Sequence, residues 1–106
     1  MHDVFFVVRL VENDEISAGY CHDLKLPFVP LEGMYFEQGI STTLWETTTG
    51  SELSPAVERV IYDLDNKQFV CLFTVDQPLA ASFWQKIDDA RVDGGTYAMK
   101  FFRNVT

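Results

Sequence analysis

The stretch GYCHD, residues 19–23, places a thiol, an imidazole and a carboxylate in consecutive positions: Cys21, His22 and Asp23. Such groups could form a cysteine nucleophile with its base, or they could ligate a metal ion. The surrounding residues 15–26 alternate between apolar and polar side chains, which predicts a β-strand. Because successive side chains of a strand point to opposite faces of the sheet, Cys21 cannot meet His22, and His22 cannot meet Asp23. The cluster therefore does not predict an active site.

The simplest interpretation is that Cys21 is a small buried hydrophobe and His22 a hydrogen-bonded core or edge residue. An enzyme that uses Cys21 or His22 stays as a third hypothesis, because His2 could approach Cys21 across a sheet. The sequence has no paired Cys/His spacing for zinc, no calcium loop and no glycine-rich phosphate loop. We therefore expect a protein that is not an enzyme and that uses no metal and no cofactor.

Three segments favour β-structure. Residues 3–12 are apolar on both faces, which predicts a strand covered on both sides and hence interior to a sheet. Residues 12–14 supply turn-forming side chains before the strand at 15–26. Residues 34–50 are rich in threonine and aromatic side chains and predict one long bent strand or two short ones, with Gly39 at the bend.

Residues 56–75 give the clearest hairpin pattern. Two runs of β-forming residues flank Asp65 and Asn66, which can adopt the positive φ of a tight turn. The predicted register pairs Leu64 with Lys67, Tyr62 with Phe69, Ile61 with Val70 and Val60 with Cys71. Apolar side chains then meet across the strands, so that the register is self-consistent.

The period changes after residue 76. Apolar residues recur at helical spacing over about 77–91, and Gly94 and Gly95 end the pattern, which predicts one helix. Residues 96–104 alternate again and predict a final strand. The chain of 106 residues is therefore predicted to form a single α+β domain, 1–106. Its antiparallel sheet of five or six strands would carry the helix packed on one face.

Charge is distributed unevenly. The chain has a net charge of −8, and its first 58 residues contain ten acidic side chains against only Arg9 and Lys25. Such a surface repels phosphate backbones, so we expect no binding to nucleic acid. No apolar run approaches the length of a membrane span, and the N-terminus lacks a signal-peptide pattern. We therefore expect a cytoplasmic protein that does not bind membranes, with both cysteines reduced.

The candidate binding residues are aromatic rings and carboxylates in the stretch without basic residues, namely Tyr35, Glu37, Trp45 and Glu46. Aromatic rings beside carboxylates favour a cation through charge pairing and cation–π attraction. Tyrosine and tryptophan also anchor protein interfaces. The alternative is that Trp45 and Tyr35 belong to the core or to a homodimer contact.

Two functions follow from this pattern. The first is a non-enzymatic interaction or regulatory protein that binds a basic partner through its acidic N-terminal half. The alternative is a domain that binds a small organic cation in a pocket lined by aromatic rings and carboxylates. The surplus of apolar strand faces also predicts a homodimer, built on sheet surface or sheet edge from residues 59–75 and 96–103.

Overall fold

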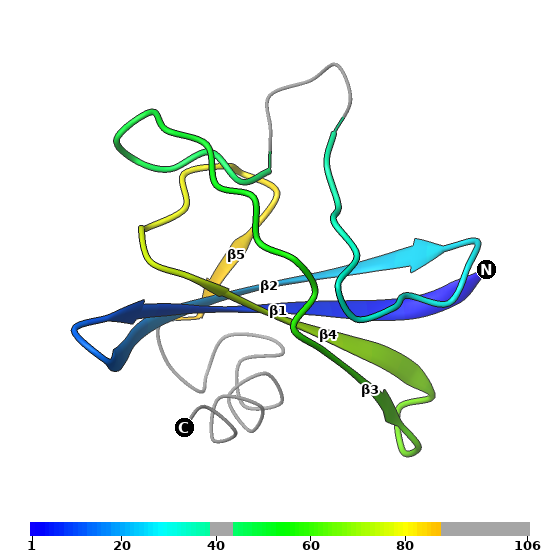
Figure 1. The fold of residues 1–106 in the computed structure, drawn as a ribbon. Helices are drawn as coiled ribbons and strands as arrows, with labels where there is room; N and C mark the ends of the chain where they lie inside the picture. Colours follow the sequence, from blue (N-terminus) through cyan, green and yellow to red (C-terminus); the bar gives the residue numbers. More distant parts are fainter. Residues whose placement is uncertain (39–43, 88–106) are drawn as a thin grey trace.

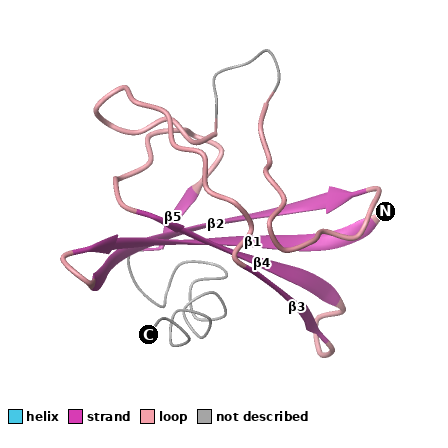
Figure 2. Ribbon diagram, in the orientation of Figure 1, coloured by secondary structure: helices cyan, strands magenta, loops and turns pink. Residues whose placement is uncertain are grey.

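The computed structural model describes residues 1–38 and 44–87, and all regular structure in these residues is β. Five strands form one sheet in the order β3-β4-β1-β2-β5 (Figures 1 and 2). The strands are β1 (His2–Glu12), β2 (Glu15–Leu26), β3 (Arg59–Asp63), β4 (Gln68–Val75) and β5 (Gln85–Ile87). The described part of the chain contains no helix, so the predicted α+β class is wrong.

Strand β1 is the central strand of the sheet, as its two apolar faces predicted. It pairs with β2 in antiparallel register through a tight turn, in which Asn13 and Asp14 both have positive φ. On its other side it pairs with β4 in parallel register, with Phe6 beside Cys71. The sheet is therefore mixed rather than antiparallel. A parallel pair needs a long crossover connection. In the connection between β2 and β3, residues 27–38 and 44–58 run over one face of the sheet (Figure 1).

The β3–β4 hairpin has the register that the sequence predicted, with Val60 opposite Cys71, Ile61 opposite Val70 and Tyr62 opposite Phe69. The turn differs from the prediction, because its positive φ falls on Lys67. The buried carboxylate of Asp63 organises this turn by accepting hydrogen bonds from Asp65 N at 2.9 Å and from Asn66 Nδ2 at 2.8 Å. An aspartate that accepts from the backbone two residues ahead commonly nucleates such a turn.

The predicted helix at 77–91 is not present over residues 77–87, and residues 88–91 lie outside the described residues. The backbone amides after Pro78 bond to distant groups instead of forming a helical ladder: Leu79 N donates to Tyr20 Oη, and Ala80 N donates to Glu46 O. The segment then pairs with the edge of β2 as β5. The segment therefore pairs with the edge of β2 instead of forming the helix that its apolar spacing predicted. Its proline also disfavours a helix.

The sequence also predicted a bent strand over residues 34–50 and a final strand at 96–104. Residues 34–38 contain no strand, and residues 44–50 contribute only isolated bridges, Glu46 with Glu52 and Thr47 with Leu79. The predicted bend at Gly39 and the final strand at 96–104 lie outside the described residues.

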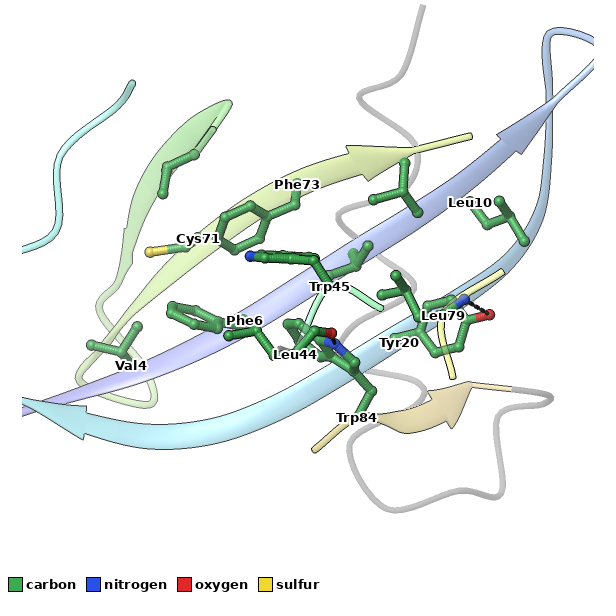
Figure 3. Close-up of a cluster of buried hydrophobic side chains, with 13 residues drawn as sticks. Val4, Phe6, Leu10, Tyr20, Leu44, Trp45, Cys71, Phe73, Leu79 and Trp84 are labelled. Carbon is green, nitrogen blue, oxygen red and sulfur yellow. Dashed lines mark hydrogen bonds between the residues drawn. The ribbon is translucent and has the colours of Figure 1, made fainter. Parts of the chain in front are cut away.

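The two faces of the sheet bury separate sets of side chains. The face under the crossover carries the larger set, which we call the main core, and which includes Phe6 and Phe73 from the sheet and Trp45 and Trp84 from the loops above it (Figure 3). The opposite face buries a smaller set: Phe5, Val7, Cys21, Val70, Leu72 and Ile87.

Three aromatic side chains fasten the loops to the main core through their polar atoms. Trp45 Nε1 donates to Phe36 O at 2.7 Å, and Trp84 Nε1 donates to Leu44 O at 2.7 Å. Tyr20 Oη accepts from Leu79 N at 3.2 Å (Figure 3). Because a buried backbone group without a partner is costly, these bonds allow loops to cover a sheet face where a helix was predicted.

Strand β1 also carries a buried cation, Arg9, whose exposed fraction is only 3%. Its Nη2 lies 2.7 Å from Glu58 Oε2 and donates to Thr74 Oγ1 at 2.9 Å, while Thr74 Oγ1 donates to Glu58 Oε2 at 2.7 Å. The facing residue on β2 is Gly19, which has no side chain. The buried guanidinium is therefore paired with a carboxylate that is itself half exposed, and a buried cation requires such a partner.

We expect Glu58→Ala to lower the free energy of unfolding by about 2 kcal/mol, because it leaves the Arg9 guanidinium without its carboxylate. In an Arg9→Met background the same substitution should cost much less, since no buried charge remains. Urea denaturation of the two single variants and the double variant measures this difference. An equal cost of Glu58→Ala in both backgrounds would contradict the pairing.

Candidate functional site

The crossover begins with a loop, residues 27–38, that is fixed to the body at several points. Gly33 N donates to Val57 O at 2.8 Å, and Val57 N donates to Met34 O at 2.8 Å. Gly33 has φ +85°, a conformation that glycine adopts without strain. The side chain of Pro30 is fully buried. The loop is therefore held in place by its backbone and by an inward-facing proline.

Phe36 is partly buried and anchors the end of this loop against the main core. Its ring packs against Phe6 with centroids 5.0 Å apart and stacks nearly parallel to Phe28 at 6.3 Å. Its carbonyl accepts the indole N–H of Trp45. The two residues that flank Phe36, Tyr35 and Glu37, are consequently presented to solvent from a fixed backbone.

Between these anchors the loop exposes large apolar side chains. These side chains are Phe28, Val29, Leu31 and Tyr35, and we call them the 27–38 surface. Their exposed fractions are 42%, 45%, 61% and 61%. Two exposed carboxylates, Glu32 and Glu37, lie on the same loop. No Lys, Arg or His occurs between Lys25 and Arg59, so the segment itself offers these carboxylates no cation.

The four predicted binding residues have different environments. Tyr35 and Glu37 are exposed, whereas Trp45 is 1% exposed and packs against Phe73 and Trp84. Glu46 is half-buried, and its backbone pairs with Glu52. The structure connects Tyr35 and Glu37 to Trp45 through the carbonyl of Phe36. Trp45 thus supports the loop from the core, as the alternative interpretation of its ring proposed.

Sequence reasoning missed Phe28, Val29 and Leu31 as parts of this surface. The signal was present in the segment LPFVPLEG, where apolar residues alternate with two prolines. Proline cannot donate a hydrogen bond to a sheet ladder, so this segment is not expected inside a sheet. Contiguous apolar side chains that a loop leaves exposed mark an interaction site.

The GYCHD cluster separates across β2, as the alternation predicted. Cys21 is buried in the smaller set of the opposite face, while His22 stacks on Phe83 with ring centroids 3.8 Å apart. Burial, and then the negative charge of Asp23, raises the pKa of the Cys21 thiol, which opposes formation of a nucleophilic thiolate. Burial likewise raises the pKa of Asp23, a shift that His22 reduces and Asp3 increases.

The open cavities in the described part of the chain include two of substantial volume. One of about 490 Å³ is lined by Val11, Leu53, Ser54, Pro55, Thr74, Val75 and Asp76. The other, of about 380 Å³, is lined by Asp3, Val4, Asp23, Leu24, Lys25 and Gln68. Neither lining contains an aromatic ring or any of the four predicted binding residues. The exposed side chains of the 27–38 surface line neither of these two cavities.

Among residues 1–38 and 44–87, no three His, Cys, Asp or Glu side chains come together to hold a metal ion. In those two ranges there is also no helix of the length and hydrophobicity needed to cross a membrane.

Comparison of the chain with models of protein families, with curated protein sequences and with solved structures found no match in any of the three. The function of the chain is therefore inferred from its own sequence and structure.

We expect both cysteines to resist modification in the native protein. Burial raises the pKa of Cys71 to about 12, and Cys21 is also raised, so neither thiolate forms at pH 8. An aromatic disulfide reagent at about pH 8 should react with neither thiol until denaturant is added. Rapid reaction of either thiol in the absence of denaturant would contradict their burial.

A matched pair of substitutions distinguishes the supporting role of Trp45 from the exposed role of Tyr35. Trp45→Phe removes the N–H that satisfies the Phe36 carbonyl and should cost about 2 kcal/mol of unfolding free energy. Tyr35→Phe removes an exposed hydroxyl and should change that free energy by less than about 0.5 kcal/mol. Thermal and urea denaturation test both, and similar effects of the two would disprove the assignment.

Proposed function

We propose that this protein is a non-enzymatic interaction protein that binds a basic, partly apolar partner through the 27–38 surface. The observation that carries the proposal is the exposure of Phe28, Leu31 and Tyr35 on a loop that also exposes Glu32 and Glu37. Large apolar side chains gathered on a surface commonly mark interaction sites, and tyrosine is enriched among interface anchors.

The anchoring of the loop supports this role. Hydrogen bonds of Gly33 and Met34 to Val57 fix the middle of the loop, and the Phe36 ring fixes its end in the main core. A surface that is already ordered loses little conformational entropy when a partner binds. The fixed loop therefore favours recognition of a preformed patch over folding upon binding.

Charge determines the chemistry of the partner. The stretch between Lys25 and Arg59 contains Glu32, Glu37, Glu46, Glu52 and Glu58 and no basic residue. Of these, Glu58 is neutralised by Arg9 and the Glu32 carboxylate accepts from Val60 N at 3.3 Å. A field of this sign attracts Lys and Arg side chains of a partner and repels nucleic acid.

The small-molecule alternative receives less support. An organic cation would need an aromatic and carboxylate-lined pocket, and the two cavities described above are lined by aliphatic and polar side chains. A thermal-shift screen of organic cations tests it, since a ligand that binds the folded state raises the unfolding temperature.

The interaction is tested with a fluorescent peptide of alternating Lys and Leu, and with an analogue that carries Glu in place of Lys. We expect binding of the basic peptide only, and weaker binding as salt is added. Leu31→Ser and Tyr35→Ala should each raise the dissociation constant about fivefold, because each removes an apolar anchor.

Two controls localise the effect. Leu64→Ser removes a side chain that is 79% exposed in the β3–β4 turn, and it should leave the affinity unchanged. Glu37→Gln should weaken binding and reduce its salt dependence, whereas Glu15→Gln, at the distant β1–β2 turn, should do neither. Equal binding of both peptides, or equal effects of the loop and control variants, would refute the proposal.

A further inference from the structure

The larger of the two cavities described above lies where the parallel strands β1 and β4 both end. Val75, the last residue of β4, and Val11, one residue before the end of β1, both line it. Residues 53–55, in the connection between β2 and β3, form its third wall. The cavity, of about 490 Å³, is therefore bounded by three separate parts of the chain.

The apolar walls of this cavity are aliphatic. They consist of Val11, Leu53, Pro55 and Val75, and no aromatic ring contributes to the lining. Val75 is buried in the main core, and Leu53 packs against that core. Because the core holds these walls in place, the cavity is preformed, and its surface suits the methylene groups of a ligand.

The polar part of the lining carries a negative charge. Asp76 is exposed, and within residues 1–38 and 44–87 neither its carboxylate nor the Ser54 hydroxyl has a hydrogen-bond or ion-pair partner. The Thr74 hydroxyl is already used, because it donates to Glu58 and accepts from Arg9. The Arg9 guanidinium is in turn paired with Glu58, so that it does not neutralise Asp76. The cavity therefore offers a ligand a carboxylate and a hydroxyl.

We propose that this cavity binds a primary ammonium group carried on a linear aliphatic chain. The ammonium donates to the Asp76 carboxylate and to the Ser54 hydroxyl, and the methylene groups lie against the aliphatic walls. An ammonium group has three donors and no acceptor, which matches these two oxygen-bearing side chains. Such an amine keeps its proton at neutral pH, as the lysine side chain does. The site is separate from the 27–38 surface and does not depend on the function proposed above.

Other classes of ligand match this lining less well. Quaternary ammonium groups are recognised by aromatic rings, which the lining lacks. An anion would meet the Asp76 carboxylate, and the nearby guanidinium of Arg9 is already paired. Both the charge and the length of an aliphatic amine should consequently contribute to its affinity.

Nuclear magnetic resonance titration of the ¹⁵N-labelled protein with n-hexylamine tests the site. The amides of Val11, Leu53 and Val75 should shift together, with a millimolar dissociation constant as expected for so small a ligand. Propylamine should bind about tenfold more weakly, because it buries three fewer methylene groups. Hexanoate and hexyltrimethylammonium, which lack the ammonium donors, should each bind at least about fivefold more weakly than hexylamine. Shifts of equal size with hexanoate, or no shifts of these amides with hexylamine, would overturn the proposal.

Substitutions locate the ammonium group. Asp76→Asn keeps the shape of the side chain and should raise the dissociation constant of hexylamine about tenfold, with loss of its salt dependence. Ser54→Ala should raise it about threefold. The matched control is Asp65→Asn, which removes the same charge at the β3–β4 turn, beyond the other end of β4, and should have no effect. Leu31→Ser, in the 27–38 surface, should also have none, so that this site and the proposed function are tested separately.

Near-ultraviolet circular dichroism verifies that these variants remain folded. Equal effects of Asp76→Asn and Asp65→Asn in folded proteins would contradict the assignment of the site.

Two further probes identify the source of the ammonium group. Butylamine and Nα-acetyl-lysine amide present the same aliphatic ammonium, the first alone and the second on a peptide backbone. Equal affinities for the two assign the cavity to a lysine side chain of a protein partner. Binding of butylamine alone assigns it to a small aliphatic amine.

Discussion

The structure depends on satisfying buried backbone groups where loops, rather than a helix, cover one face of a sheet. A helix bonds its own backbone, whereas an irregular segment must find external partners for each buried N–H and C=O. Here the partners are the polar atoms of large aromatic side chains: Trp45 and Trp84 donate to carbonyls, and Tyr20 accepts from an amide. The same rings fill the main core, so that packing and backbone satisfaction are achieved by the same residues.

This arrangement links the core to the candidate binding surface. The carbonyl that Trp45 binds belongs to Phe36, and the neighbours of Phe36 in sequence are the exposed Tyr35 and Glu37. The position of the outward side chains is therefore set by an indole ring that is itself almost inaccessible to solvent. The sequence suggested that Tyr35, Glu37 and Trp45 belong to one binding site. In the structure Tyr35 and Glu37 lie at the surface, and Trp45 supports their loop from the core.

Periodicity in the sequence predicted the strands correctly where a strand pairs with a near neighbour in the chain. The interior position of β1, the alternation of β2 and the register of the β3–β4 hairpin follow from which side chains are apolar. The parallel contact of β1 with β4 has no such signal, because it depends on the path of the long connection between β2 and β3 rather than on a local period. The helical spacing of Leu79, Phe83 and Ile87 gave a wrong prediction of a helix. The chain turns between these residues, so that Leu79 and Ile87 pack on opposite faces of the sheet.

The candidate surface was predictable only in part for a related reason. The sequence indicates which residues are aromatic or acidic, but exposure depends on the path of an irregular loop. Tyr35 and Glu37 are at the surface, while Trp45, of the same character, is in the core. The exposure of Phe28 and Leu31 was not predicted, because apolar residues are ordinarily assigned to the interior.

The parallel pairing of β1 with β4 also bears on how the chain is made. Strand β1 and its hairpin partner β2 leave the ribosome before β4, so the edge of β1 that pairs with β4 lacks this neighbour until Gln68–Val75 has been synthesised. During that interval an apolar strand, Val4 to Leu10, displays open hydrogen-bonding groups, which is the condition under which nascent chains associate wrongly. Contacts between residues so distant in sequence also form slowly. Translation of the crossover therefore sets how long this edge of β1 stays without its parallel neighbour.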